Sequence, residues 1–153
     1  MALPNNDPIY TRVADVQATT LTGNLGPTAN TAQDGTGTIY PIWTADATNG
    51  GFLQKLSLQS ISTTALTVMR VFICNTVPTV TSGALVSNTA ANTWLLTELT
   101  LPAVTVSQTS GNIHLELPIN LALPPSFRIC VAFGTSTGAS TTGWSVLGIG
   151  GKY

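Results

Sequence analysis

The single histidine of this chain, His114, lies two residues before Glu116 in the segment NIHLELP. Side chains two positions apart on a β-strand point to the same side, so this pair could bind a metal ion or relay a proton. No third ligand candidate lies nearby in the sequence, and a Ser-His-acid triad would need the same histidine. We therefore interpret the pair as an exposed strand face above Ile113, Leu115 and Leu117, and we expect no metal site.

The rest of the chain offers few groups for catalysis. Its six Asp and Glu residues are spread over 153 positions, and no serine lies in a G-x-S-x-G nucleophile elbow. The glycine-rich segments 35–37 and 148–153 precede no helix pattern, which a phosphate-binding loop requires. Arg70 and Arg128 each lie in an apolar strand pattern, where an arginine usually reaches solvent or pairs with a glutamate. The sequence predicts a protein that is not an enzyme and binds no cofactor.

The composition excludes further classes of function. Only 7% of the residues are charged, and the net charge is -1 with no basic cluster, so we expect neither nucleic acid nor an anionic membrane as a partner. No run approaches the ~20 apolar residues of a membrane span, and the N-terminus has no visible secretory signal. A mean hydropathy of +0.31 argues for a folded chain. So few charges suit a fixed assembly better than a solitary monomer.

Two regions differ in texture. Residues 1–34 are rich in Thr, Asn, Pro and Gly without sustained periodicity, which predicts an extended N-terminal arm. Within the arm, residues 11–17 alternate and could form a strand if a partner supplied the other edge. Residues 35–153 show short apolar runs separated by turn residues, which predicts one antiparallel β-sandwich.

The predicted strands of this sandwich number seven, with residues 75–92 as a long polar connection of the kind found in Greek-key and jelly-roll topologies. In the second strand, strict alternation places Phe52, Leu56 and Leu58 on one face and Leu53 on the other. In the third strand both faces are apolar enough to be covered. The predicted strands span residues 38–45, 52–61, 65–74, 93–103, 112–119, 127–134 and 143–150.

The cysteines and tryptophans leave alternatives open. Cys74 and Cys130 end apolar runs, and their spacing fits no zinc signature, so we expect buried free thiols, with a disulfide between neighbouring strands as the alternative. The three tryptophans could stack on sugars. Each lies in an apolar strand pattern, however, where core packing is the commoner arrangement. They are Trp43, Trp144 and Trp94.

Residues 34 to 153 resemble a small virion protein of tailed bacteriophages. The resemblance rests on a turn bounded by TA and NG, then on R-x-F-I, E-x-x-x-P-A, L-P-x-x-x-R-I and a terminal G-W-x-V followed by G-x-Y. The chain departs from it at Pro125, where Gly or Ala is usual. The matching residues are Thr44, Ala45, Asn49, Gly50, Arg70, Phe72, Ile73, Glu98, Pro102, Ala103, Leu123, Pro124, Arg128, Ile129, Gly143, Trp144, Val146, Gly151 and Tyr153.

This resemblance implies a jelly-roll-like capsid decoration (cement) protein, made in the host cytoplasm and located on the capsid exterior. Its partners would be the major capsid protein and further copies of itself, as a homotrimer. An arm of ~34 extended residues would reach on the order of 100 Å, enough to bridge capsomers. The alternative is a tail or fibre module that recognises host glycan. The expected capsid-binding residues of the arm are Leu3, Ile9, Tyr10, Arg12, Val13, Leu21 and Leu25.

Overall fold

The structure, a computed structural model, describes residues 11–22, 29–75, 80–81, 84–85, 88–135 and 143–153. These residues form strands and no helix, so none of them builds a helix that could cross a membrane. The strands are β1 Val13–Thr22, β2 Tyr40–Thr44, β3 Gly51–Ser60, β4 Thr67–Cys74, β5 Val80–Thr81, β6 Ala84–Leu85, β7 Thr93–Leu101, β8 His114–Leu123, β9 Arg128–Phe133 and β10 Gly143–Lys152.

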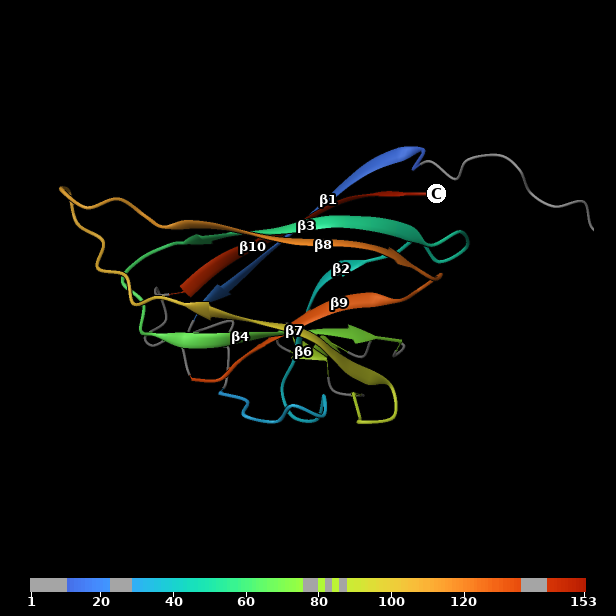
Figure 1. The fold of residues 1–153 in the computed structure, drawn as a ribbon, viewed down its shortest axis with the longest axis horizontal. Helices are drawn as coiled ribbons and strands as arrows, with labels where there is room; N and C mark the ends of the chain where they lie inside the picture. The colour runs from blue at the N-terminus through green and yellow to red at the C-terminus, as the bar shows by residue number, and fades with distance from the viewer. Residues whose placement is uncertain (1–10, 23–28, 76–79, 82–83, 86–87, 136–142) are drawn as a thin grey trace, which may run out of the picture.

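Eight strands form two antiparallel sheets, which Figure 1 shows as two layers. The strand order is β1-β10-β3-β8 in the first sheet and β2-β9-β4-β7 in the second. When the small β5–β6 hairpin is set aside, the remaining eight strands pair from the two ends of the chain inward. β1 pairs with β10, β2 with β9, β3 with β8 and β4 with β7. This nested pairing is the topology of a jelly roll. The prediction of an all-β antiparallel sandwich is confirmed.

Strand β1 lies inside the segment expected to be an arm. It pairs with β10 over ten residues, from Val13 opposite Lys152 to Thr22 opposite Gly143. The strand pattern in residues 11–17 therefore finds its partner in the same chain, and the expected boundary at residue 34 does not hold for β1. An edge strand needs few apolar residues, because it bonds to one neighbouring strand only and packs against the core with one face only. Hydropathy alone therefore did not distinguish β1 from an arm.

Gln17 of β1 also joins the two sheets. Its amide nitrogen donates a hydrogen bond to the Thr44 carbonyl (2.9 Å), and its amide oxygen accepts one from the Thr44 N–H (3.0 Å). These bonds satisfy two backbone groups at the end of β2, which is an edge strand of the second sheet. The Gln17 side chain therefore links the edge strand β1 of the first sheet to the edge strand β2 of the second sheet.

The main core fills the space between the sheets. Trp43 and Trp144 are both fully buried there, with Leu56 and Leu58 of β3 and Met69 of β4. The two indoles are among the largest side chains of this core, and glycines make room for one of them. A Cβ atom on Gly148 would lie 2.7 Å from Cβ of Trp43, so β10 approaches this ring because it carries glycine there.

The faces of β3 differ from the predicted alternation. Leu53 is buried with Leu56 and Leu58, whereas Phe52 is only half-buried. Against β10, Leu53 pairs with Gly150 and Lys55 with Ile149, which marks Gln54 as the extra residue of a β-bulge. One extra residue in a strand moves all the side chains before it to the opposite face of the sheet. Strict alternation therefore predicted the wrong face for Leu53 and Phe52.

Residues 29–38 run along the outer side of the second sheet (Figure 1), and a second, smaller cluster of buried side chains lies on that face. The backbone N–H of Asn30 donates to the Phe133 carbonyl (2.8 Å), which attaches this segment to β9. Its side-chain amide donates to the carbonyls of Thr36 and Thr38. The prediction that both faces of the strand at 65–74 are covered is confirmed. The buried cluster consists of Ile39, Phe72, Cys74, Cys130 and Ala132.

Candidate interaction surface

His114 and Glu116 lie on the exposed face of β8, as predicted, with half-buried leucines between them. Each contacts a residue of the neighbouring strand β3: Nε2 of His114 lies 2.8 Å from the Ser57 hydroxyl, and Glu116 accepts a hydrogen bond from Lys55 at 2.6 Å. The Lys55 ammonium holds the pKa of Glu116 below its usual value. His114 and Glu116 thus each belong to a different cross-strand pair, and such pairs stabilise a sheet.

Two other carboxylates stabilise turns. Asp46 accepts hydrogen bonds from the backbone N–H groups of Asn49 and Thr48, and these bonds lower its pKa. Asp34 accepts from the hydroxyl and the N–H of Thr36, with the same effect on its pKa. Among the described residues, no group of three His, Cys, Asp or Glu side chains could hold a metal ion.

The two arginines of the strand patterns behave differently. Arg70 donates from Nε to Glu98 (2.7 Å) and from Nη1 to the Asn30 carbonyl (2.9 Å), so its predicted pairing with a glutamate is confirmed. Arg128 is only 6% exposed, and its Nη1 has no hydrogen-bond partner in the described part of the chain. The expectation that Arg128 reaches solvent or pairs with a glutamate is therefore wrong, because this side chain lies on the covered outer face of the second sheet.

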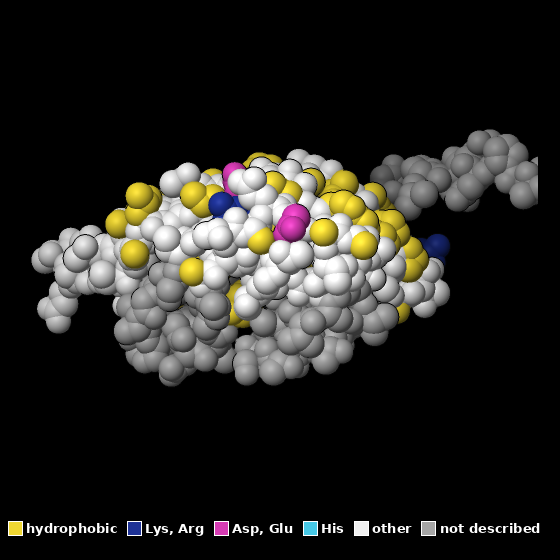
Figure 2. Space-filling model, turned by 90° about the horizontal axis from the view of Figure 1, so that it is seen from below, with side chains coloured by type: hydrophobic (Ala, Val, Ile, Leu, Met, Phe, Trp, Pro, Cys, Tyr) yellow, Lys and Arg dark blue, Asp and Glu magenta, His cyan; other side chains and the backbone are white. Residues whose placement is uncertain are grey.

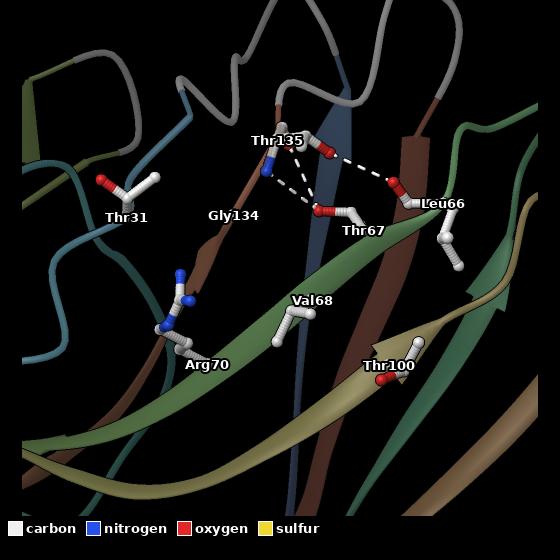
Figure 3. Close-up of a pocket in the computed structure, with 8 residues that line it drawn as sticks. All are labelled: Thr31, Leu66, Thr67, Val68, Arg70, Thr100, Gly134 and Thr135. Carbon is white, nitrogen blue, oxygen red and sulfur yellow. Dashed lines mark hydrogen bonds between the residues drawn. The ribbon is translucent and has the colours of Figure 1, made fainter.

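A pocket of about 290 Å³ opens at the start of β4 (Figure 3). Thr67 and Thr135 bond to each other through hydroxyl and backbone groups, and the Thr135 hydroxyl donates to the Leu66 carbonyl. Arg70 points into the same region, but its guanidinium is already bonded to Glu98 and Asn30. The pocket is thus lined mainly by threonine and aliphatic side chains, and its residues do not place an acid, a base or a nucleophile where it could catalyse a reaction.

The cysteines are free and fully buried on adjacent strands, as expected. Cys130 of β9 lies opposite Phe72 of β4, and Cys74 lies two residues further along β4. Burial raises the pKa of the Cys130 thiol well above its usual value. The thiolate is the form that attacks a thiol reagent, so burial protects this residue twice, by excluding the reagent and by keeping the thiol protonated.

We therefore expect the native protein to react very slowly with Ellman's reagent at neutral pH, and both cysteines to react at once in denaturant without any reductant. The measurement is the absorbance of the released thiolate over time. Immediate reaction of the folded chain would contradict the burial of these thiols. A denatured chain without reactive thiols would instead reveal the alternative disulfide.

Of the three tryptophans, only Trp94 is accessible. Trp43 and Trp144 are fully buried, which confirms the core assignment for these two, whereas Trp94 on β7 is 45% exposed. The expectation of core packing is wrong for Trp94, because β7 is an edge strand and this residue lies near its beginning. A sugar-stacking platform built from all three rings is therefore not formed.

Trp94, Leu95 and Leu96 form an exposed apolar run on β7, which we call the β7 patch. Regular alternation would bury at least one of three consecutive residues. The register against β4 shifts here, with Val71 opposite Thr97 but Phe72 opposite Leu95, so Leu96 is the extra residue of a bulge. The bulge accounts for the exposure of these three neighbouring side chains.

The surface around these features carries few charges. Figure 2 shows one face on which charged side chains are sparse and apolar side chains lie among uncharged polar atoms. Within the described ranges, ion pairs join Lys55 to Glu116, Arg70 to Glu98, and Lys152 to Asp15. Arg12 remains as an exposed cation for which the described residues supply no ion pair. Most of the cationic charge is thus already neutralised within the chain.

The expected capsid-binding residues are only partly described. Arg12 and Val13 are exposed at the start of β1, and Leu21 lies in β1, where the backbone alone is described. The other four lie outside the described residues: Leu3, Ile9, Tyr10 and Leu25. Sequence reasoning missed the β7 patch, whose signal was the run of apolar residues in TWLL on a strand that proved to be at an edge.

Comparison of the chain with protein-family models, curated proteins and solved structures finds no match.

Proposed function

We propose that this protein is a structural component of a bacteriophage particle, a decoration protein that binds the outside of the head and stabilises it. Its partners would be the major capsid protein and other copies of the same chain, arranged as a trimer. The alternative function is a tail or fibre module that binds host glycan.

The topology supports this proposal without deciding it. Double-sheet jelly rolls occur in viral capsid proteins, and they also occur in lectins. A fold by itself does not imply a function, so the argument must come from the surface. In the described residues, that surface combines sparse charge with an apolar edge and presents no catalytic grouping, which suits attachment to other protein subunits.

Several of the residues that carry the phage resemblance occupy positions with a clear structural role. Gly50 has a φ of +80°, and a Cβ atom there would lie within 2.4 Å of the Leu123 carbonyl oxygen. Trp144 fills the core, and Arg70 pairs with Glu98 across two strands. The resemblance therefore supports a shared architecture, from which the function is proposed by analogy.

One observation favours the decoration function over glycan binding. Trp43 and Trp144 are buried between the sheets, so the aromatic surface suggested as a sugar platform is reduced to Trp94. That remaining ring lies in an apolar run on an open strand edge, which resembles a protein contact more than a sugar site, because sugar sites pair an aromatic ring with convergent polar groups.

The proposal predicts a high copy number on the head. Quantitative mass spectrometry of particles purified from the virus that encodes the chain should find it in amounts comparable with the major capsid protein. The purified protein should also sediment with undecorated capsids from the same virus. As a control, tails separated from heads should lack it.

A copy number far below that of the major capsid protein, with the chain recovered in the tail fraction, would contradict the decoration function. Binding of the purified chain to host surface polysaccharide, abolished by Trp94→Ala, would then support the alternative.

A further inference from the structure

We propose that copies of this chain associate head to tail, with the β7 edge of one copy against the β1 edge of the next. This inference rests on the proposed function in one respect, the self-association, and it identifies the surfaces involved. It concerns the sandwich alone and can be tested without the capsid.

The four edge strands of the sandwich differ in how open they are. A protected edge is short, bulged, or interrupted by proline or charge. β2 has only five residues, contains Pro41, and is bonded at Thr44 by Gln17. β8 contains Pro118 and exposes charged Glu116. These two edges are poor templates for another chain.

The other two edges are longer than β2 and contain no proline, although β1 carries Asp15 and β7 carries Glu98. β1 runs for ten residues without proline and pairs with β10 without a register shift. β7 runs for nine residues without proline or lysine. In the described part of the chain, each has one neighbour in its sheet, so the other edge offers unpaired backbone groups. A bulge interrupts β7 at Leu96, but the residues after it pair regularly with β4.

Exposed apolar side chains gather on these same two edges. β7 carries the patch of Trp94, Leu95 and Leu96, and β1 carries Val13 and Val16, of which Val13 is 61% exposed. Because the two strands lie at opposite ends of the strand orders, in different sheets, one copy presents both surfaces at once. Surfaces of this kind join head to tail, and a ring closes when the rotation between copies permits it.

Charge complementarity points to the same pairing. Arg12 lies just before β1 and is exposed, with no ion pair in the described residues. Glu98 on β7 is exposed and uses one carboxylate oxygen for Arg70. A neighbouring Arg12 would supply a cation for the other oxygen. The apolar side chains alone are too few for the 1,200 to 2,000 Å² that stable interfaces bury, roughly, so the contact must include the strands themselves.

The test uses the purified full chain and two lysine variants. Light scattering coupled to size exclusion should give an oligomer for the wild type. Trp94→Lys and Val16→Lys should each reduce the mass to that of the 15.8 kDa monomer, because each destroys one of the two edges. Leu66→Lys is the matched control: this residue is equally exposed at 61% but lies on neither edge, so its oligomer should persist.

Mixing separates a head-to-tail contact from a symmetric one. Trp94→Lys retains an intact β1 edge and Val16→Lys retains an intact β7 edge, so an equimolar mixture should form a dimer and nothing larger. Circular dichroism should show that both variants keep the β fold.

A monomeric wild type, variants that retain the oligomer, or a mixture that stays monomeric would each overturn the inference. A monomeric wild type would remove the proposed trimer but not the decoration function, because a monomeric decoration protein would still show a high copy number on heads and still sediment with capsids.

Discussion

A chain that begins at residue 23, and so lacks β1, is expected to lose about 3 kcal/mol or more of its free energy of unfolding, out of the roughly 5–15 kcal/mol typical of a domain. β1 forms a ten-residue ladder with β10, and each lost backbone hydrogen bond costs on the order of 1 kcal/mol before the regained chain entropy is subtracted. Urea titration followed by tryptophan fluorescence measures the loss.

The control is a chain that begins at residue 11 and therefore retains β1. Comparing the two truncations isolates the contribution of the strand. Equal urea midpoints would show that β1 is not part of the stable sandwich and would restore the arm as first expected. Gln17→Ala gives a graded version, expected to cost about 1–2 kcal/mol through its two bonds to Thr44, and exposed Gln59→Ala is its matched control.

Trp43→Ala is expected to destabilise the sandwich by about 3–5 kcal/mol, because it empties the centre of the core. The ring is fully buried and lies against Gly148 and Gly51, where the backbone of β10 and β3 has no side chain that could fill the space. Trp43→Phe should cost much less, since it keeps most of the apolar volume and removes an indole N–H without a hydrogen-bond partner among the described residues. Chemical denaturation followed by circular dichroism measures both changes.

Trp94→Ala provides the matched control for this experiment, since it removes the same side chain from an exposed position. Its cost should be below about 1 kcal/mol. Any loss that comes from self-association should grow with protein concentration, whereas the loss for Trp43→Ala should not. Equal losses for the two variants at low concentration would contradict the assignment of Trp43 to the core.

The sandwich strands β2 to β4 and β7 to β10 could be predicted because each combines β-branched and apolar residues with turn residues at both ends. For β1, only residues 11–17 were predicted as a strand, and then only with a partner, because the rest of its sequence resembles a loop and its partner β10 lies at the other end of the chain. Tertiary pairing decided its structure, and no local pattern records that pairing.

The candidate surface was harder to predict than the fold. In the sequence, the three residues of the β7 patch, Trp94, Leu95 and Leu96, resemble buried strand residues. Their exposure follows from the position of β7 at a sheet edge and from the bulge at Leu96, neither of which can be read from hydropathy. The same reason explains the error at Phe52 and Leu53, where the bulge at Gln54 against β10 exchanges the two faces of β3. Bulges depend on the neighbouring strand, so they are visible only once the sheet is assembled.

The pairing of β1 with β10 also sets the order of events during synthesis. A ribosome releases β1 among the first described residues and β10 among the last, so the first sheet has no permanent neighbour for β1 until translation of the domain is nearly complete. Contacts so distant in sequence make folding slow, on the millisecond to second scale typical of β-sandwiches. Until then, the apolar strands β3, β4 and β9 lack a finished partner layer. The nascent chain therefore depends on rapid completion, or on a chaperone, to avoid aggregation.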